Sequence, residues 1–400
     1  MLKELTQKKD RGIYSTLFFL SIVLACSNFF NRGNLVCFLV LAVNTALLLW
    51  KGREIEFDLE CLLGILFFVG AAFAAGLFFG FEEGLKGCNV LMAYFVGRNT
   101  YKQLSTQEEK KEFVKKLAFC AFLGVSAYLT GTYLVNLINP HQSVRCLYNP
   151  WSDSYGLIAV TLIGLQCSVV IGYSFYAFFI QKNTGVKICA GVSVFVCLLL
   201  NIKTATRTPL LLFGLIYAFM TLISLGRLNK KLLKTIGIIV LSVVGVTALV
   251  LLTDLFRLRQ TIFNIPIIKR LFQDGFSTPR IQEYIAHFKA TPFHLIGGLE
   301  LKAEVGNYAH NFLQDAHDRY GFCALLAMGG FGAGFVINLF ALVFTRGKTA
   351  TDYLLLSLNA AIFLQVCLEP VFSGYPLIIW TALLLYGVTT SHLQERGKGL

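Results

Sequence analysis

The stretch NYAHNFLQDAHDRYG, at 307–321, is unusually polar for this apolar chain and carries side chains suited to chemistry. His310 can act as a general base near neutral pH, bind a metal ion or form hydrogen bonds in a protein interior. If the stretch forms a short helix, His310 and His317 are separated by about 10 Å along its axis, too far to share one ion. Asp315 and Asp318 add no tight ligand spacing, so we expect no metal site here.

Two arginines stand beside predicted helix starts. Arg207 precedes a Thr-Pro pair at 208–209, and Arg280 follows a Thr-Pro pair at 278–279; we expect each Thr to cap a helix whose first residue is the Pro. A cation at a helix N-terminus opposes the macrodipole, so these arginines need another reason to be there. A guanidinium beside free backbone N–H groups suits a phosphate or diphosphate. In the alternative interpretation, Arg207 extends to the membrane interface and Arg280 pairs with Glu283.

Glu369, just before Pro370, ends an apolar run. An acid at membrane depth is costly and usually serves a role, so we expect Glu369 to face inward. The alternative is an interfacial residue that stays solvated. Other acidic residues expected at the same face are Glu82, Glu83, Asp153, Glu300 and Glu304.

The elements that must position these residues are membrane helices. The chain has 400 residues, of which 56% are hydrophobic and 14% charged, with a mean hydropathy of +0.66. Soluble domains do not show this balance, and about twenty apolar residues suffice for one helical crossing. The twelve predicted spans are 13–30, 33–50, 59–80, 84–97 (short), 114–138, 155–180, 185–202, 209–225, 232–253, 322–345, 353–372 and 375–391.

The connectors predict the orientation. If the N-terminus is cytoplasmic, the cytoplasmic connectors carry 22 Lys and Arg, whereas the short connectors on the other side carry 5. This asymmetry follows the positive-inside rule and predicts that both termini are cytoplasmic. We therefore expect one membrane domain over 1–400, with one large extracytoplasmic loop at 255–320. The net charge of +13 is spread over short connectors, which argues against nucleic-acid binding.

Three blocks carry a resemblance to a known family. HNFLQDAHDRYG, in which Gly321 follows His310 by eleven positions, resembles the His-Asn signature of the O-antigen ligase and polymerase superfamily. TATRTPLLLFGL resembles that family's Arg-containing segment at the start of a span. STPRIQEYIAHFKATPFHLIGG resembles its periplasmic Arg helix. The resemblance is specific over about 200–325, and elsewhere it extends only to topology.

The resemblance implies an inverting, metal-independent glycosyltransferase of the bacterial inner membrane, whose site lies on the periplasmic face and needs no cofactor. The donor would be an oligosaccharide on undecaprenyl diphosphate. Arg207 and Arg280 would bind the diphosphate, and His310 would activate or orient the acceptor hydroxyl. Asn311, His317 and Glu369 are further candidates for the site.

Two alternatives stay open. In an O-antigen or capsule polymerase the acceptor is a second lipid-linked repeat unit, and a chain-length regulator is a possible partner. In an O-antigen ligase the acceptor is the lipid A core; we favour the polymerase because nothing marks a dedicated site for that core. A flippase for lipid-linked sugars is the alternative from another class, although the chain shows neither related halves nor many charges within spans.

Overall fold

The computed structural model describes residues 16–51, 55–141, 143, 146–151, 156–225, 280–290, 295–298, 309–372 and 377–398. The predicted span 232–253, the Thr-Pro pair at 278–279 and most of the predicted loop 255–320 lie outside these residues.

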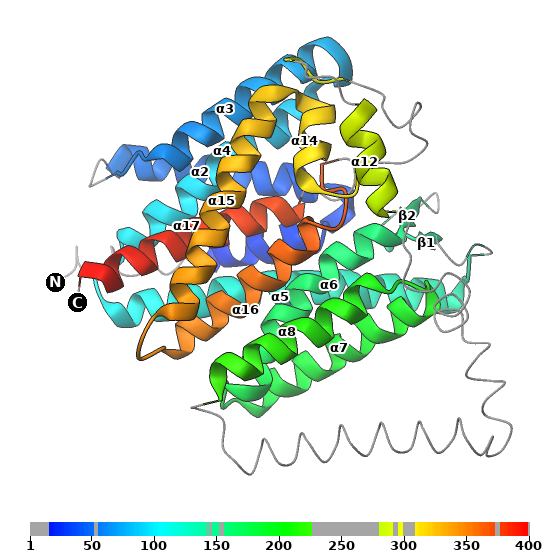
Figure 1. Ribbon diagram of the computed structural model, residues 1–400. Coiled ribbons are helices and arrows are strands. Elements are labelled where there is room, and N and C mark those ends of the chain that lie inside the picture. Colours follow the sequence, from blue (N-terminus) through cyan, green and yellow to red (C-terminus); the bar gives the residue numbers. More distant parts are fainter. Residues whose placement is uncertain are drawn as a thin grey trace, which may run out of the picture.

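The described chain is predominantly helical, which confirms the predicted all-α class (Figure 1). Seven of its helices are long and apolar enough to cross a membrane, and the total of twelve spans stays a prediction. The helices are Thr16–Cys26, η1 (Phe29–Asn31), α2 (Gly33–Lys51), α3 (Leu59–Ala74), η2 (Ala75–Phe79), α4 (Phe81–Lys102), α5 (Gln107–Ile138), α6 (Val160–Phe179), α7 (Thr184–Lys203), α8 (Thr208–Ser224), α12 (Arg280–Ala290), α14 (Phe312–Tyr320), α15 (Phe322–Phe344), α16 (Ala350–Val366) and α17 (Leu377–Lys398). The strands β1 (Cys146–Tyr148) and β2 (Leu157–Ala159) form an antiparallel pair.

Several predicted spans differ at their ends from the observed helices. The range 155–180 begins too early, because Leu157–Ala159 form β2 and α6 begins at Val160. The range 84–97, predicted as short, lies within the 22-residue helix α4. The range 353–372 is too long at its C-terminal end, because α16 ends at Val366 and turns follow at 367–368 and 371–372. Pro370 contributes to that ending, because it has no N–H to bond the Val366 carbonyl oxygen four residues before it, and its ring would clash with that carbonyl.

Helix α4 is the polar centre of the bundle. It packs against α2, α3 and α17 and buries charged side chains that lipid would not accept, including Glu83, Lys86 and Arg98. Close backbone contact makes this burial possible. A Cβ on Gly97 would lie 2.2 Å from the Leu384 carbonyl oxygen of α17. Small residues at such crossings bring membrane helices together.

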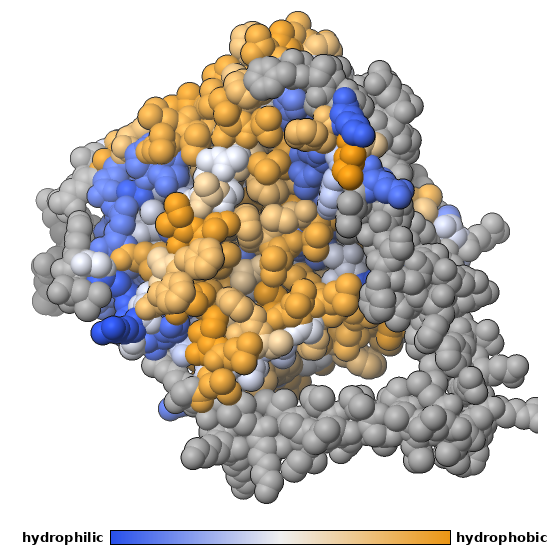
Figure 2. Space-filling view, viewed as in Figure 1, coloured by the Kyte–Doolittle hydropathy of each residue, from blue (hydrophilic) through white to orange (hydrophobic). Residues whose placement is uncertain are grey.

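The two ends of the bundle differ. Figure 1 shows α12, α14 and the β1–β2 pair gathered at one end, while the last turn of α17 lies at the other. Between them, an apolar band covers the helices in the view of Figure 2, and hydrophilic residues gather near α12 and near the end of α17. This distribution is that of a bundle set across a bilayer.

Candidate functional site

The signature stretch folds as the short helix α14, with His310 two residues before its first residue. Asn311 is the N-cap: its side-chain oxygen accepts a hydrogen bond from Gln314 N at 2.8 Å. Gly321 ends the helix with φ +79°, and a Cβ there would lie 2.3 Å from the Leu295 carbonyl oxygen. The structure therefore gives Asn311 and Gly321 local reasons for their places around His310.

His310 lies between two carboxylates from distant parts of the chain. Its Nε2 is 3.5 Å from Oε2 of Glu283 on α12, and its Nδ1 is 3.6 Å from Oε2 of Glu369, beyond the end of α16. The hydroxyl of Tyr284 also donates to the His310 carbonyl oxygen at 2.8 Å. The imidazole thus lies between two carboxylates at ion-pair distances, and its Nδ1 makes no hydrogen bond to Glu369 at 3.6 Å.

The two carboxylates differ in exposure. The Glu369 side chain is 1% exposed, which confirms that it faces inward and makes the solvated alternative wrong. The Glu283 side chain is 15% exposed and His310 17%. A ligand would therefore reach the Nε2 side of the ring, next to Glu283, before the Nδ1 side.

A second acid–histidine pair joins α12 to α14. His287 Nδ1 lies 3.5 Å from Asp318 Oδ2, and His287 is buried. Sequence reasoning missed this pair. The available signal was spacing, because Glu283 and His287 are four residues apart and share a face of α12. This face lies opposite His310, just before α14, and Asp318 on α14. His317, the other histidine of the stretch, is buried on α14.

Arg280 is the first residue of α12. Its side chain lies outside the described structure, so its predicted diphosphate contact and its alternative pairing with Glu283 are both untested. The backbone places Arg280 three residues, or one helical turn, before Glu283. Arg280 therefore lies in the same helical turn as Glu283, whose carboxylate lies next to His310.

Arg207 is the N-cap of α8, and Thr208 is already inside the helix. The prediction that Thr208 is the cap was wrong by one position, because the Arg207 carbonyl already accepts from Leu210 N and Leu211 N, both at 3.1 Å. The start of α8 lies beside the end of α16: a Cβ on Gly164 would be 3.3 Å from Pro209 Cγ and 3.1 Å from Gln365 Nε2. Since Gln365 is four residues before Glu369, Arg207 and Glu369 belong to the same end of the bundle.

A buried cluster of charged and polar side chains joins α14 to α4. The Glu83 carboxylate of α4 accepts from Lys86 Nζ at 2.7 Å, from Arg319 Nη2 at 2.5 Å and from the Tyr320 hydroxyl. Burial raises the pKa of Tyr320 well above its ordinary value, so this phenol stays protonated and donates. The cluster fixes the C-terminal half of α14 to the bundle.

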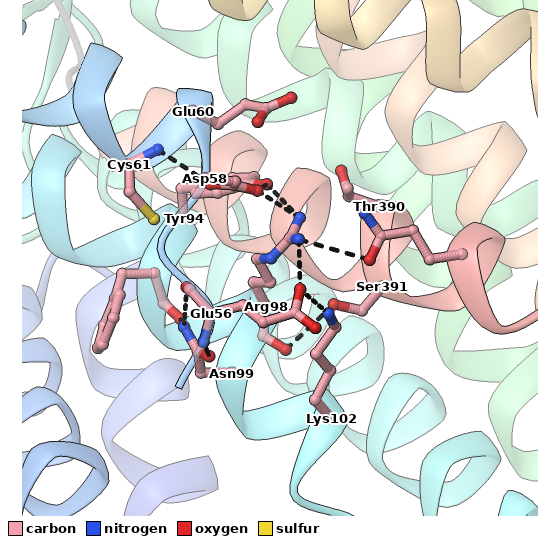
Figure 3. A network of polar contacts seen from close by, with 12 residues as sticks. Glu56, Asp58, Glu60, Cys61, Tyr94, Arg98, Asn99, Lys102, Thr390 and Ser391 are labelled. Carbon is pink, nitrogen blue, oxygen red and sulfur yellow. Dashed lines mark hydrogen bonds and ion pairs between the residues drawn. The ribbon is translucent and has the colours of Figure 1, made fainter. Parts of the chain in front are cut away.

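A separate network lies at the opposite end of α4 (Figure 3). Arg98 pairs with Glu56 at 2.7 Å and with Asp58 at 2.5 Å, and Lys102 also binds Glu56. Ser391 of α17 donates to the Arg98 carbonyl oxygen at 3.1 Å. These charges compensate one another, so we interpret the network as a structural tie between the 55–58 segment, α4 and α17.

The sequence matches no known protein-family model, and no curated protein matches it.

Proposed function

We propose that this chain is an inverting, metal-independent glycosyltransferase that takes a glycan from undecaprenyl diphosphate and adds it to a second lipid-linked repeat unit of O-antigen or capsule. The observation that supports it best is the position of His310. It lies between Glu283 and Glu369, at the bundle end where Arg207 is the N-cap of α8 and Arg280 is the first residue of α12.

The proposed reaction is a single displacement at the anomeric carbon. The acceptor hydroxyl oxygen attacks this carbon, its proton goes to His310 Nε2, and the bond to the diphosphate oxygen breaks with inversion. Glu369 near Nδ1 orients the ring and stabilises the imidazolium that forms. Arg207 and Arg280 stabilise the charge on the leaving undecaprenyl diphosphate; removing one such group typically costs about 3–4 kcal/mol of transition-state stabilisation.

The proposed location is the bacterial inner membrane, with the site on the periplasmic face and both termini in the cytoplasm. Hydropathy supports a membrane location, and the charge of the connectors supports the orientation. The end of α17 lies away from α12 and α14, as this orientation requires (Figure 1). A chain-length regulator remains a possible partner.

The test uses purified protein in lipid vesicles with one undecaprenyl diphosphate-linked repeat unit and no other acceptor, and separates the products by size. We expect a ladder of products that Arg280→Ala lacks and Arg346→Ala keeps. Arg346 is a suitable control because it is an exposed arginine in the connector between α15 and α16. Loss of the ladder in both variants would argue against a specific role for Arg280.

The other outcomes separate the alternatives. Transfer that appears only when a lipid A core is added would make the protein a ligase. No transfer to either acceptor would refute the transferase proposal. Movement of the lipid-linked donor between leaflets of the same vesicles would then identify a flippase, which shares the ligand but makes no new bond.

A further inference from the structure

We propose that Asp315 is a positioning residue that holds Glu369 against His310. The inference rests on the proposed function, because it assigns Asp315 a part in the same site. Asp315 contacts neither His310 nor Glu369 in the hydrogen bonds described; it acts on the turn that follows Glu369.

Asp315 lies on the inner side of α14 and is 2% exposed. Its Oδ2 accepts hydrogen bonds from two consecutive backbone groups, Val371 N at 2.7 Å and Phe372 N at 2.5 Å. Bonds to an ionised acceptor are stronger than those between neutral groups. A buried carboxylate is costly unless it is paired and hydrogen-bonded. These two hydrogen bonds therefore bind α14 firmly to the turn at 371–372.

The turn that Asp315 binds is also held at other points. The Phe372 carbonyl oxygen accepts from Lys86 Nζ at 3.4 Å. The Phe372 ring packs 5.1 Å from the Phe67 ring and 5.5 Å from the Tyr320 ring. Pro370 restricts the backbone between Glu369 and these contacts of Phe372. The position of Glu369 therefore follows from the position of Phe372.

Helix α14 connects the two halves of the site. His310 stands two residues before the first residue of the helix, and Asp315 lies in its first turn. The Asp315 backbone N–H donates to the Asn311 carbonyl oxygen at 3.1 Å, so the residues between them are in regular geometry. Helix α14 thus follows His310 directly and, through Asp315, binds the backbone at Val371 and Phe372, just after Glu369. Catalytic pairs need geometry held within about 0.5 Å, and we infer that this connection serves that need.

The experiment is a double-mutant cycle with Asp315→Asn and Glu369→Gln, measured as kcat and KM in the vesicle assay. Asparagine keeps the volume and one acceptor oxygen but removes the charge. We expect Asp315→Asn to lower kcat about 10- to 100-fold with KM for the donor unchanged within about twofold. In the Glu369→Gln background the same substitution should change kcat by less than about twofold, because Asp315 acts through Glu369. Additive effects on kcat would overturn the inference.

Asp352→Asn is the matched control. Asp352 is also a buried carboxylate that accepts a backbone N–H, from Thr349, but it lies in the first turn of α16, at the opposite end of that helix from Glu369. There it also pairs with His392 and Arg396. Its effect on kcat should add to that of Glu369→Gln, since the two sites are independent. If Asp315→Asn does not yield folded protein, Lys86→Met removes the bond to Phe372 from the other side and should show the same non-additivity.

Failure of the proposed function would look different. If the unsubstituted protein transfers no glycan, or if His310→Ala and Arg207→Ala keep full transfer, the function itself is wrong and this inference falls with it. If those variants are inactive but the cycle is additive, the function stands and only the role of Asp315 is wrong.

Discussion

Glu83→Gln tests the energetics of the cluster beneath α14. Glu83 is 4% exposed and pairs with two cations, Lys86 and Arg319, whose side chains are 11% and 24% exposed. Glutamine has nearly the same shape and can still accept from Tyr320, so the change removes charge more than packing. Removing one partner of a buried ion pair typically destabilises a protein by about 3–5 kcal/mol. We expect the lower part of that range, about 3 kcal/mol, because Arg319 is partly exposed and also lies over the Phe79 ring at 4.6 Å.

The compensating variant sharpens this prediction. Lys86→Met in the Glu83→Gln background removes the more deeply buried cation, so at least about half of the lost free energy of unfolding should return. The assay is reversible unfolding in mixed micelles of dodecyl maltoside and SDS. A loss below about 1 kcal/mol for Glu83→Gln, or no recovery in the double variant, would refute the view that Glu83 compensates buried charge.

Three further predictions use other parts of the molecule. His310→Gln should lower kcat about 10²- to 10⁴-fold in the vesicle assay, as loss of a general base does; an unchanged kcat would exclude this role. Gly97→Val should destabilise the protein by about 1–3 kcal/mol, because its Cβ would meet the Leu384 carbonyl oxygen; an unaltered melting temperature would contradict the close crossing of α4 and α17. Hydrogen bonds from Lys102 and Arg98 lower the pKa of Glu56 below its ordinary value of about 4.5. The contribution of Glu56 to the free energy of unfolding is therefore present above about pH 4.5 and lost as pH falls through its folded-state pKa. On acidification, the melting temperature should fall more steeply in the unsubstituted protein than in Glu56→Gln.

The sequence by itself determined the class of this protein and the local form of its signature. Runs of apolar residues must form helices in a bilayer, because only helices and closed barrels satisfy the backbone there. The short helix at α14 was also predictable, since a capping Asn311 and a terminating Gly321 act within a few residues. Such features depend on neighbours along the chain.

Only the tertiary structure decided the rest. Polar residues made α4 look like a short, weak span, and its full length is stable because α2, α3 and α17 enclose its charges. The acids at His310 come from positions 283 and 369, and Asp315 binds residues 371 and 372. No local periodicity relates residues so far apart in sequence; they meet because the bundle packs, and a buried charge there is tolerated only beside its partner.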